Sequence, residues 1–173
     1  MLYWLVGQFH VPYLKSQRGE ELMMKRMIII VFVAALIFFD HLGHAADEAT
    51  LESNKKIVKE FYELAINKKD FEAASKYLGP RYIQHNQRAA DGADGLKDFV
   101  RLLRTKFPDS HSEIKRIFAD GDYVILHVHA IRGQGARGVA IVDIFRLQDS
   151  KIVEHWDVHE DILEKAANPN DMF

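Results

Sequence analysis

The chain has 173 residues, of which 48% are hydrophobic and 28% are charged, as in an ordinary globular protein rather than a disordered or fibrous one. A net charge of −2 provides no basic stripe, which argues against a nucleic-acid partner. The lack of cysteine excludes disulfide bonds, thiolate metal sites and a cysteine nucleophile.

The N-terminal region has the pattern of a secretory signal peptide. Lys25 and Arg26 precede a wholly apolar run over residues 28–39. This run is too short for a membrane span, which needs about 20 apolar residues. We therefore predict cleavage near Ala45 or Ala46 and export to the bacterial periplasm or medium, with no membrane attachment afterwards. An uncut membrane anchor and a buried helix are the alternatives.

Residues 1–22 do not fit in front of this signal, because a signal peptide begins with its basic residues. Met23 and Met24 stand directly before the basic pair. We predict that translation begins at one of these methionines and that residues 1–22 are a mis-annotated extension. The signal peptide then covers residues 23–46, and one domain covers residues 47–173.

The first half of this domain shows helical periodicity. Three helices are expected, each with recognisable ends. The first begins with Ser53 as its N-cap, and the second is capped by Asp70 and stopped by Gly79-Pro80. The third is capped by Asp94 and ended by Pro108.

From residue 112 onward the hydrophobic period is two, which indicates strands. Extended segments are expected at residues 81–85, 113–119, 123–131, 139–147 and 152–160. Helices followed by an antiparallel meander favour an α+β fold. We predict a cone-shaped barrel, in which a curved, mainly antiparallel sheet packs on the three N-terminal helices and encloses a pocket.

One carboxylate falls on an apolar strand face. Asp143 shares its face with Ile141 and Phe145, and a buried carboxylate is costly unless it is paired or serves a site. Burial would raise the pKa of such a group and let it carry a proton near neutral pH. A structural pairing with Arg81, Arg88 or a histidine is the alternative.

Histidines cluster on two of the strands. His127 and His129 share one face of the segment 123–131, and His155, Asp157 and His159 share one face of the last segment. A solvated sheet face explains such histidines equally well. Asp157 is the stronger functional candidate, because a carboxylate beside imidazoles can work as an acid or a base.

Other site types find less support in the sequence. His85 and Asn86 lie either at a pocket rim or in a plain turn. The spacing of His127 and His129 resembles that of cupins, but the expected glutamate is missing and no metal site is predicted. A Gly-x-Ser-x-Gly nucleophile elbow and a phosphate-binding glycine loop are both absent from the sequence.

Three blocks of sequence, at residues 82–86, 142–146 and 152–158, resemble the SnoaL-like polyketide cyclase family. This family belongs to the nuclear-transport-factor-2-like superfamily of cone-shaped α+β proteins. The blocks stand in family order, and the likeness covers nearly all of residues 53–173. The resemblance implies ring closure by intramolecular aldol condensation without a metal or organic cofactor.

The resemblance also implies roles for individual residues. Catalytic roles are expected for three residues: Asp157 as the acid/base, with His129 and Asp143. Substrate contacts are expected for five more residues: Tyr82, His85, Asn86, His127 and His155. Such chemistry needs a base of tuned pKa and a donor for the developing oxyanion.

We therefore expect a cofactor-free acid/base enzyme, of the aldol or isomerase type, acting on a small hydrophobic carbonyl compound. Export argues against a cytoplasmic polyketide as that compound. A non-catalytic periplasmic module that binds a small hydrophobic ligand is the alternative, because fold does not fix reaction. Trp156 and Val158 lie on an apolar outer face that needs a cover, so a homodimer is also predicted.

Overall fold

The computed structural model describes residues 20–28 and 47–173. The predicted cleavage site near Ala45 or Ala46 and most of the predicted signal peptide lie outside these residues. Residues 20–28 are helical, and among the described residues no helix is long and apolar enough to cross a membrane. Residues 47–173 form one compact unit, which holds all the features discussed below.

The helical half of the domain differs from the prediction at its first N-cap. Residues 47–62 are helical and continue into the π-helical turn η1 (Glu63–Asn67). Ser53 lies inside this helix, so the predicted cap is wrong. The described residues before it, Asp-Glu-Ala-Thr-Leu-Glu, include several good helix formers that extend the helix toward the N-terminus.

The second helical segment is capped as predicted and ends earlier. Asp70 Oδ1 accepts a hydrogen bond from Ala73 N at 3.0 Å at the start of α2 (Phe71–Ala74), which a 3-10 turn, η2 (Ser75–Tyr77), follows. The chain then enters β1 (Leu78–Gln84), so Gly79 and Pro80 lie within a strand rather than after a helix. An edge strand can accommodate this proline, because its missing N–H is not needed by a neighbour.

The third helical segment of the compact unit, α3 (Gly92–Lys106), begins after Asp91 instead of Asp94. The Asp91 carboxylate does not cap the helix but accepts a hydrogen bond from Gln84 N at 2.8 Å. Gly95 lets the helix approach the preceding loop, because a Cβ at this position would overlap the backbone of Ala90. The loop that follows β1 is therefore held closely against α3.

The strands follow the predicted segments closely. They are β1, β2 (His111–Asp120), β3 (Tyr123–Ile131), β4 (Val139–Gln148) and β5 (Lys151–Asp161). Their order is β1-β5-β4-β3-β2, with antiparallel pairing except between β1 and β5. The predicted mainly antiparallel α+β sheet is confirmed, but β1 and β2 remain as free edges, so the sheet does not close into a barrel.

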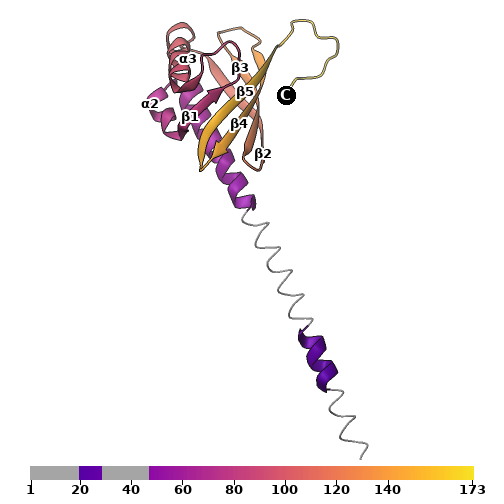
Figure 1. Cartoon of the computed structure of the whole chain (residues 1–173). Helices are drawn as coiled ribbons and strands as arrows, with labels where there is room; N and C mark the ends of the chain where they lie inside the picture. Colours follow the sequence, from indigo (N-terminus) through magenta and orange to yellow (C-terminus); the bar gives the residue numbers. More distant parts are fainter. Residues whose placement is uncertain (1–19, 29–46) are drawn as a thin grey trace, which may run out of the picture. The chain divides into compact units, whose positions relative to one another are not determined.

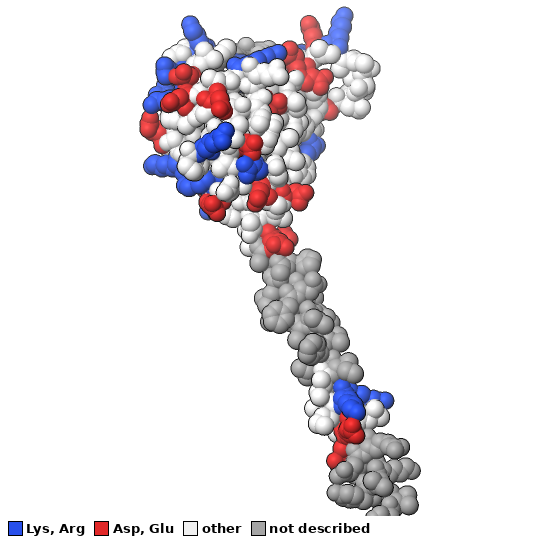
Figure 2. Space-filling model, viewed as in Figure 1, with Lys and Arg blue, Asp and Glu red and all other residues white. Residues whose placement is uncertain are grey.

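Helical segments cover one face of this sheet, and the core lies between them (Figure 1). Val124, Leu126, Val128 and Ala130 of β3 point into it and are fully buried. Burial of such side chains contributes about 1.5–3 kcal/mol each for the larger ones. Figure 2 shows acidic and basic side chains interspersed over the visible face of this domain, without a basic stripe.

Candidate functional site

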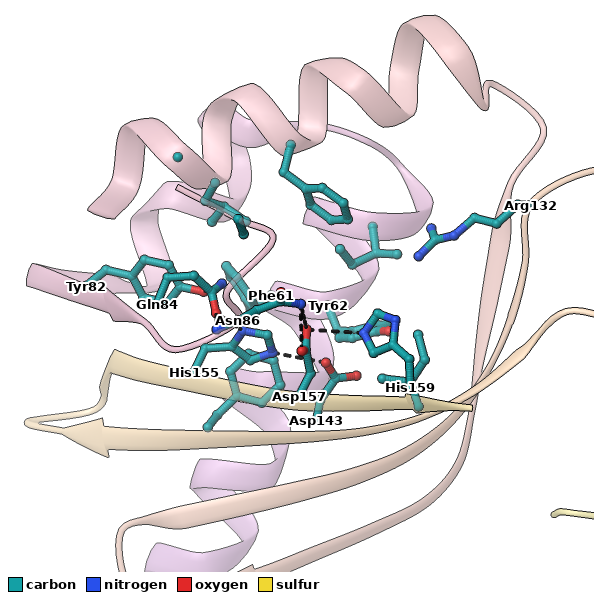
Figure 3. Close-up of a pocket in the computed structure, with 17 residues that line it drawn as sticks. Phe61, Tyr62, Tyr82, Gln84, Asn86, Arg132, Asp143, His155, Asp157 and His159 are labelled. Carbon is teal, nitrogen blue, oxygen red and sulfur yellow. Dashed lines mark hydrogen bonds and ion pairs between the residues drawn. The ribbon is translucent and has the colours of Figure 1, made fainter. Parts of the chain in front are cut away.

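A pocket lies between the inner face of the sheet and the helices, with a cavity of about 110 Å³. Its walls are largely apolar and come from the helices and from β4: Phe61, Ile66, Leu96, Phe99, Ile141 and Phe145. Polar side chains converge on the same space, most of them from the strands (Figure 3). An apolar cavity with a few convergent polar groups is the usual form of a small-molecule site.

The two-residue period of β5 places three polar side chains along the pocket floor. His155, Asp157 and His159 all line the pocket, with side-chain exposures of 10%, 11% and 35%. They therefore lead from the buried interior toward the pocket mouth. On the neighbouring strand, Asp143 is the cross-strand partner of Asp157, and its side chain is 7% exposed.

His155 is held at both ring nitrogens by oxygen atoms. Its Nδ1 lies 3.1 Å from Gln84 Oε1, and its Nε2 lies 3.0 Å from Asp143 Oδ1. Gln84 Oε1 also accepts a hydrogen bond from Asn86 N at 2.8 Å, which identifies this atom as the amide oxygen. His155 Nδ1 must therefore carry a proton that it donates to Gln84.

The contact between His155 Nε2 and Asp143 requires one more proton. Because Nδ1 is already protonated, an ionised Asp143 demands an imidazolium, and a neutral imidazole demands a protonated Asp143. The pair holds this proton in either case and is neutral overall. The other oxygen, Asp143 Oδ2, is buried and has no hydrogen-bond partner among the described residues. Asp143 lines the pocket, although Oδ2 itself is shielded from solvent.

Asp157 is held as a carboxylate by two neighbours. Asn86 Nδ2 donates to its Oδ1 at 2.7 Å and to its Oδ2 at 2.9 Å, and His159 Nε2 lies 3.3 Å from Oδ2. Burial alone would raise the pKa of Asp157, but these hydrogen bonds and the charge of His155 lower it below its usual value. The same contact with Asp157 raises the pKa of His159.

Two tyrosines complete the polar wall. The Tyr82 hydroxyl accepts a hydrogen bond from Gln84 Nε2 at 3.2 Å. Burial, followed by the charge of Asp143, raises the pKa of both Tyr62 and Tyr82. Both therefore stay protonated at neutral pH, and their hydroxyl groups can donate hydrogen bonds.

The structure brings together five of the residues that the sequence singled out: Tyr82, Asn86, Asp143, His155 and Asp157. His85 does not line the pocket. Its ring stacks on Trp156 at 4.4 Å between centroids, and its Nε2 lies 3.1 Å from Glu154 Oε1. His85 directly follows β1, and side chains alternate between the two faces of a sheet along a strand. It therefore lies on the outer face, beside Trp156 of β5.

His127 and His129 also lie away from the pocket. The inward positions of β3 are the even-numbered ones, so both histidines occupy the outer face. His127 Nδ1 lies 3.1 Å from Arg116 Nη1, and His129 Nε2 lies 2.8 Å from Arg137 O. The ring of Phe173 packs against both imidazoles. The structure therefore separates them from Asp157, with which the sequence analysis had grouped them.

Four further polar residues line the pocket without having been predicted as site residues: Tyr62 of the first helix, and Gln84, Arg132 and His159. The last three continue an alternation that the sequence already contains. Gln84 stands midway between Tyr82 and Asn86, and Arg132 follows Ala130 by two residues. The signal was therefore the two-residue period itself, which places Gln84 and His159 on the pocket face within expected strands and Arg132 one residue beyond the end of another.

A metal ion is the other group that these side chains could hold. Asp143, His155 and Asp157 each offer one ligand atom, and these atoms lie within 4.8 Å of one another. However, His155 Nε2 and Asp143 Oδ1 already bind each other, and Asn86 engages both oxygens of Asp157. A metal would have to break these bonds, so the donor set fits an ion poorly.

Comparison with known proteins gives one family and several structures. The sequence model of the SnoaL-like polyketide cyclase family matches residues 56–164. TsrD from Streptomyces laurentii is 20% identical over 63% of this chain and 89% of its own length, with a TM-score of 0.55. A candidate polyketide cyclase from Acidithiobacillus ferrooxidans is 22% identical over 62% of this chain and 88% of its own, with a TM-score of 0.53.

A third similar structure is AclR, a candidate hydroxylase from Streptomyces galilaeus. It is 23% identical over 64% of this chain and 81% of its own, with a TM-score of 0.54. Identities at this level show a shared fold and leave the reaction open. Comparison with curated proteins gave no match.

Proposed function

The chain belongs to the SnoaL-like polyketide cyclase family, and we propose that its pocket is the active site of an acid/base enzyme that uses no cofactor. The substrate is a small hydrophobic carbonyl compound, and the reaction is of the aldol or isomerase type. One observation carries this proposal: the hydrogen-bonded pair of His155 and Asp143 lies beside the carboxylate of Asp157, with one ligand atom of each of the three residues within 4.8 Å of the others. An acid and a base therefore face the same small cavity.

Asp157 is the base. Its lowered pKa keeps it ionised at neutral pH, so it can accept a proton from the carbon next to a carbonyl group. The electron pair of that C–H bond then forms the carbon–carbon double bond of an enol. Asn86 and His159 hold the carboxylate in position, and the protonated Asp157 returns its proton later in the cycle.

The pair formed by His155 and Asp143 is the acid. As the enol forms, the carbonyl oxygen gains electrons and takes the proton that His155 Nε2 and Asp143 Oδ1 share, which leaves the pair with one negative charge. In an aldol step the enol carbon attacks a second carbonyl group, the enol O–H proton returns to the pair, and the new alkoxide takes the proton held by Asp157. In an isomerisation the proton held by Asp157 is delivered to another carbon, and the O–H proton returns to the pair. General acid–base catalysis of this kind contributes about 10²–10⁴-fold in rate.

The test follows proton exchange, which every version of this mechanism requires. The full-length chain is incubated in D₂O with small alkyl and aryl ketones, both neutral ones and ones that also carry a carboxylate, and loss of the α-proton signal is followed by NMR. We expect Asp157→Asn to slow the catalysed exchange by about 10²-fold or more. Asp161→Asn, on the same strand but outside the pocket, is the matched control and should exchange like the wild type. Equal rates for Asp157→Asn and the wild type would refute the proposed base.

A non-catalytic binding module remains the second candidate function. The observation in its favour is the apolar wall, to which Phe61, Leu96 and Phe99 contribute, since it suits any hydrophobic ligand. The same samples discriminate between the two functions. Ketone binding without α-proton exchange in the wild type would favour the binding module.

We also propose that the chain is exported and that it forms a homodimer. Export is supported by the basic pair and the short apolar run ahead of the domain. The homodimer is supported by an outer sheet face on which Val158 is 67% exposed and Trp156 is half-buried.

A further inference from the structure

Arg132 is a cation in the pocket that the proposed mechanism does not use. It follows directly after β3 and continues the inward-facing positions of that strand, whose last core residue is Ala130. Figure 3 shows its side chain extending from the end of β3 into the pocket. A guanidinium is charged at any physiological pH and presents its donors in a planar fork.

The guanidinium of Arg132 lacks a protein partner. Within the two described segments, 20–28 and 47–173, it takes part in neither a hydrogen bond nor an ion pair. The pocket carboxylates are engaged elsewhere, Asp157 by Asn86 and His159 and Asp143 by His155. A half-buried, unpaired guanidinium is unfavourable in the free protein, and an anion that enters the pocket relieves this cost.

The charges of the pocket add up in favour of an anion. His155 and Asp143 share one proton and are neutral together, while Asp157 is offset by the protonated form of His159. Arg132 therefore leaves the pocket with a net charge of about +1 when His159 is protonated. The positive charge of Arg132 also acts on Tyr62 and His159. It works to lower the pKa of each, although larger effects leave both pKa values raised.

We propose that Arg132 binds a carboxylate of the substrate, which makes the substrate class a small oxo acid rather than a neutral ketone. This inference rests on the proposed function for the reacting carbonyl group. Arg132 and His159 lie at the ends of β3 and β5, which point the same way, whereas His155 and Asp143 lie deeper along the sheet. The carboxylate then sits at the mouth and the carbonyl group inside, so Arg132 fixes the orientation of the substrate. A charge-assisted, bidentate contact is the geometry for which arginine is suited.

Two probes that differ only in charge test the proposal by calorimetry on the full-length chain: phenylacetate and its neutral analogue phenylacetamide. We expect the wild type to bind phenylacetate at least about tenfold more tightly. Arg132→Gln should remove this preference by weakening phenylacetate alone, and Arg132→Lys should retain part of it. Arg137→Gln is the matched control, because Arg137 lies in the same loop and does not line the pocket.

Three results would overturn the inference: equal affinities in the wild type, a preference that survives in Arg132→Gln, or no binding of either probe up to about 10 mM. Thermal unfolding of each variant confirms that it is folded. The outcome is separable from that of the proposed function. Preference for phenylacetate with no α-proton exchange would refute the enzyme and keep the carboxylate site, whereas exchange without this preference would refute only the carboxylate site.

Discussion

Asp143 and Asp157 face each other across the β4–β5 ladder, yet each is bound by a different set of partners. Asp143 contacts His155, whereas Asp157 contacts Asn86 and His159. Two neighbouring carboxylates in a partly apolar pocket do not both ionise without cost. The separate partners resolve this conflict by keeping Asp157 charged and by supplying Asp143 with a shared proton.

Two substitutions of Asp143 distinguish its hydrogen bond to His155 from its role as a proton donor. Asp143→Asn can donate from its amide to a neutral His155, so we expect the free energy of unfolding to fall by less than about 1 kcal/mol. Asp143→Ala leaves His155 Nε2 buried without a partner and should cost about 1–3 kcal/mol. Urea unfolding measures both values. Equal losses would contradict a hydrogen-bonded pair, and both variants should lose α-proton exchange because neither carries the acid.

The contact between Asp157 and His159 makes stability depend on pH in a defined window. The lowered pKa of Asp157 contributes stability above its unfolded value, near pH 4, and this is lost as the pH falls through the folded pKa. The raised pKa of His159 contributes stability below its unfolded value, near pH 6.5, and this is lost as the pH rises through the folded pKa. The contact therefore stabilises most between about pH 4 and 6.5.

The variant His159→Gln reports this effect directly. We expect the wild type to be more stable than the variant by at most about 1 kcal/mol near pH 5.5, since the imidazole is partly exposed. The difference should shrink as the pH rises toward about 8.5, because His159 loses its proton as the pH rises through its folded pKa. Chemical denaturation at both pH values gives the two differences, and an increase toward high pH would have the wrong sign.

Metal titration tests whether Asp143, His155 and Asp157 together bind a metal ion. Because Asp143, His155 and Asp157 already have protein partners, we expect Zn²⁺ or Mn²⁺ at about 0.1 mM to leave the unfolding temperature unchanged. Chelation by EDTA should likewise leave α-proton exchange unchanged. A stabilisation by metal that disappears in His155→Gln would show instead that the cluster is a metal site.

The predicted homodimer is tested at the outer face of the sheet. Light scattering should give a dimer for the wild type and a monomer for Val158→Lys, which places a charge on that face. Leu163→Lys is the control, because Leu163 is 62% exposed but follows the last strand. A monomeric wild type would rule out the prediction.

Export is tested by the N-terminus of the protein recovered from a bacterial host. We expect the mature chain to begin at Ala46 or Asp47 and to be found outside the cytoplasm. Mass spectrometry of the precursor should detect no peptide that covers residues 2–22. Detection of such a peptide would show that translation begins before Met23.

The sequence by itself determined the family, the α+β class and the strands, because hydrophobic period and turn residues act over short distances along the chain. It also showed that Asp143 occupies a buried face, since its neighbours two residues away are apolar. The errors lay at local ends: good helix formers extend the first helix beyond Ser53, and pairing with β5 places Gly79 inside a strand.

Only the tertiary structure decided which polar residues meet. Alternation shows that His127 and His129 share a face, but the helices determine which face encloses the pocket, and they cover the other one. The bond between Asn86 and Asp157 joins residues 71 positions apart through the parallel pairing of β1 with β5. The pocket thus depends on strand register and helix packing, which are properties of the whole fold rather than of any local pattern.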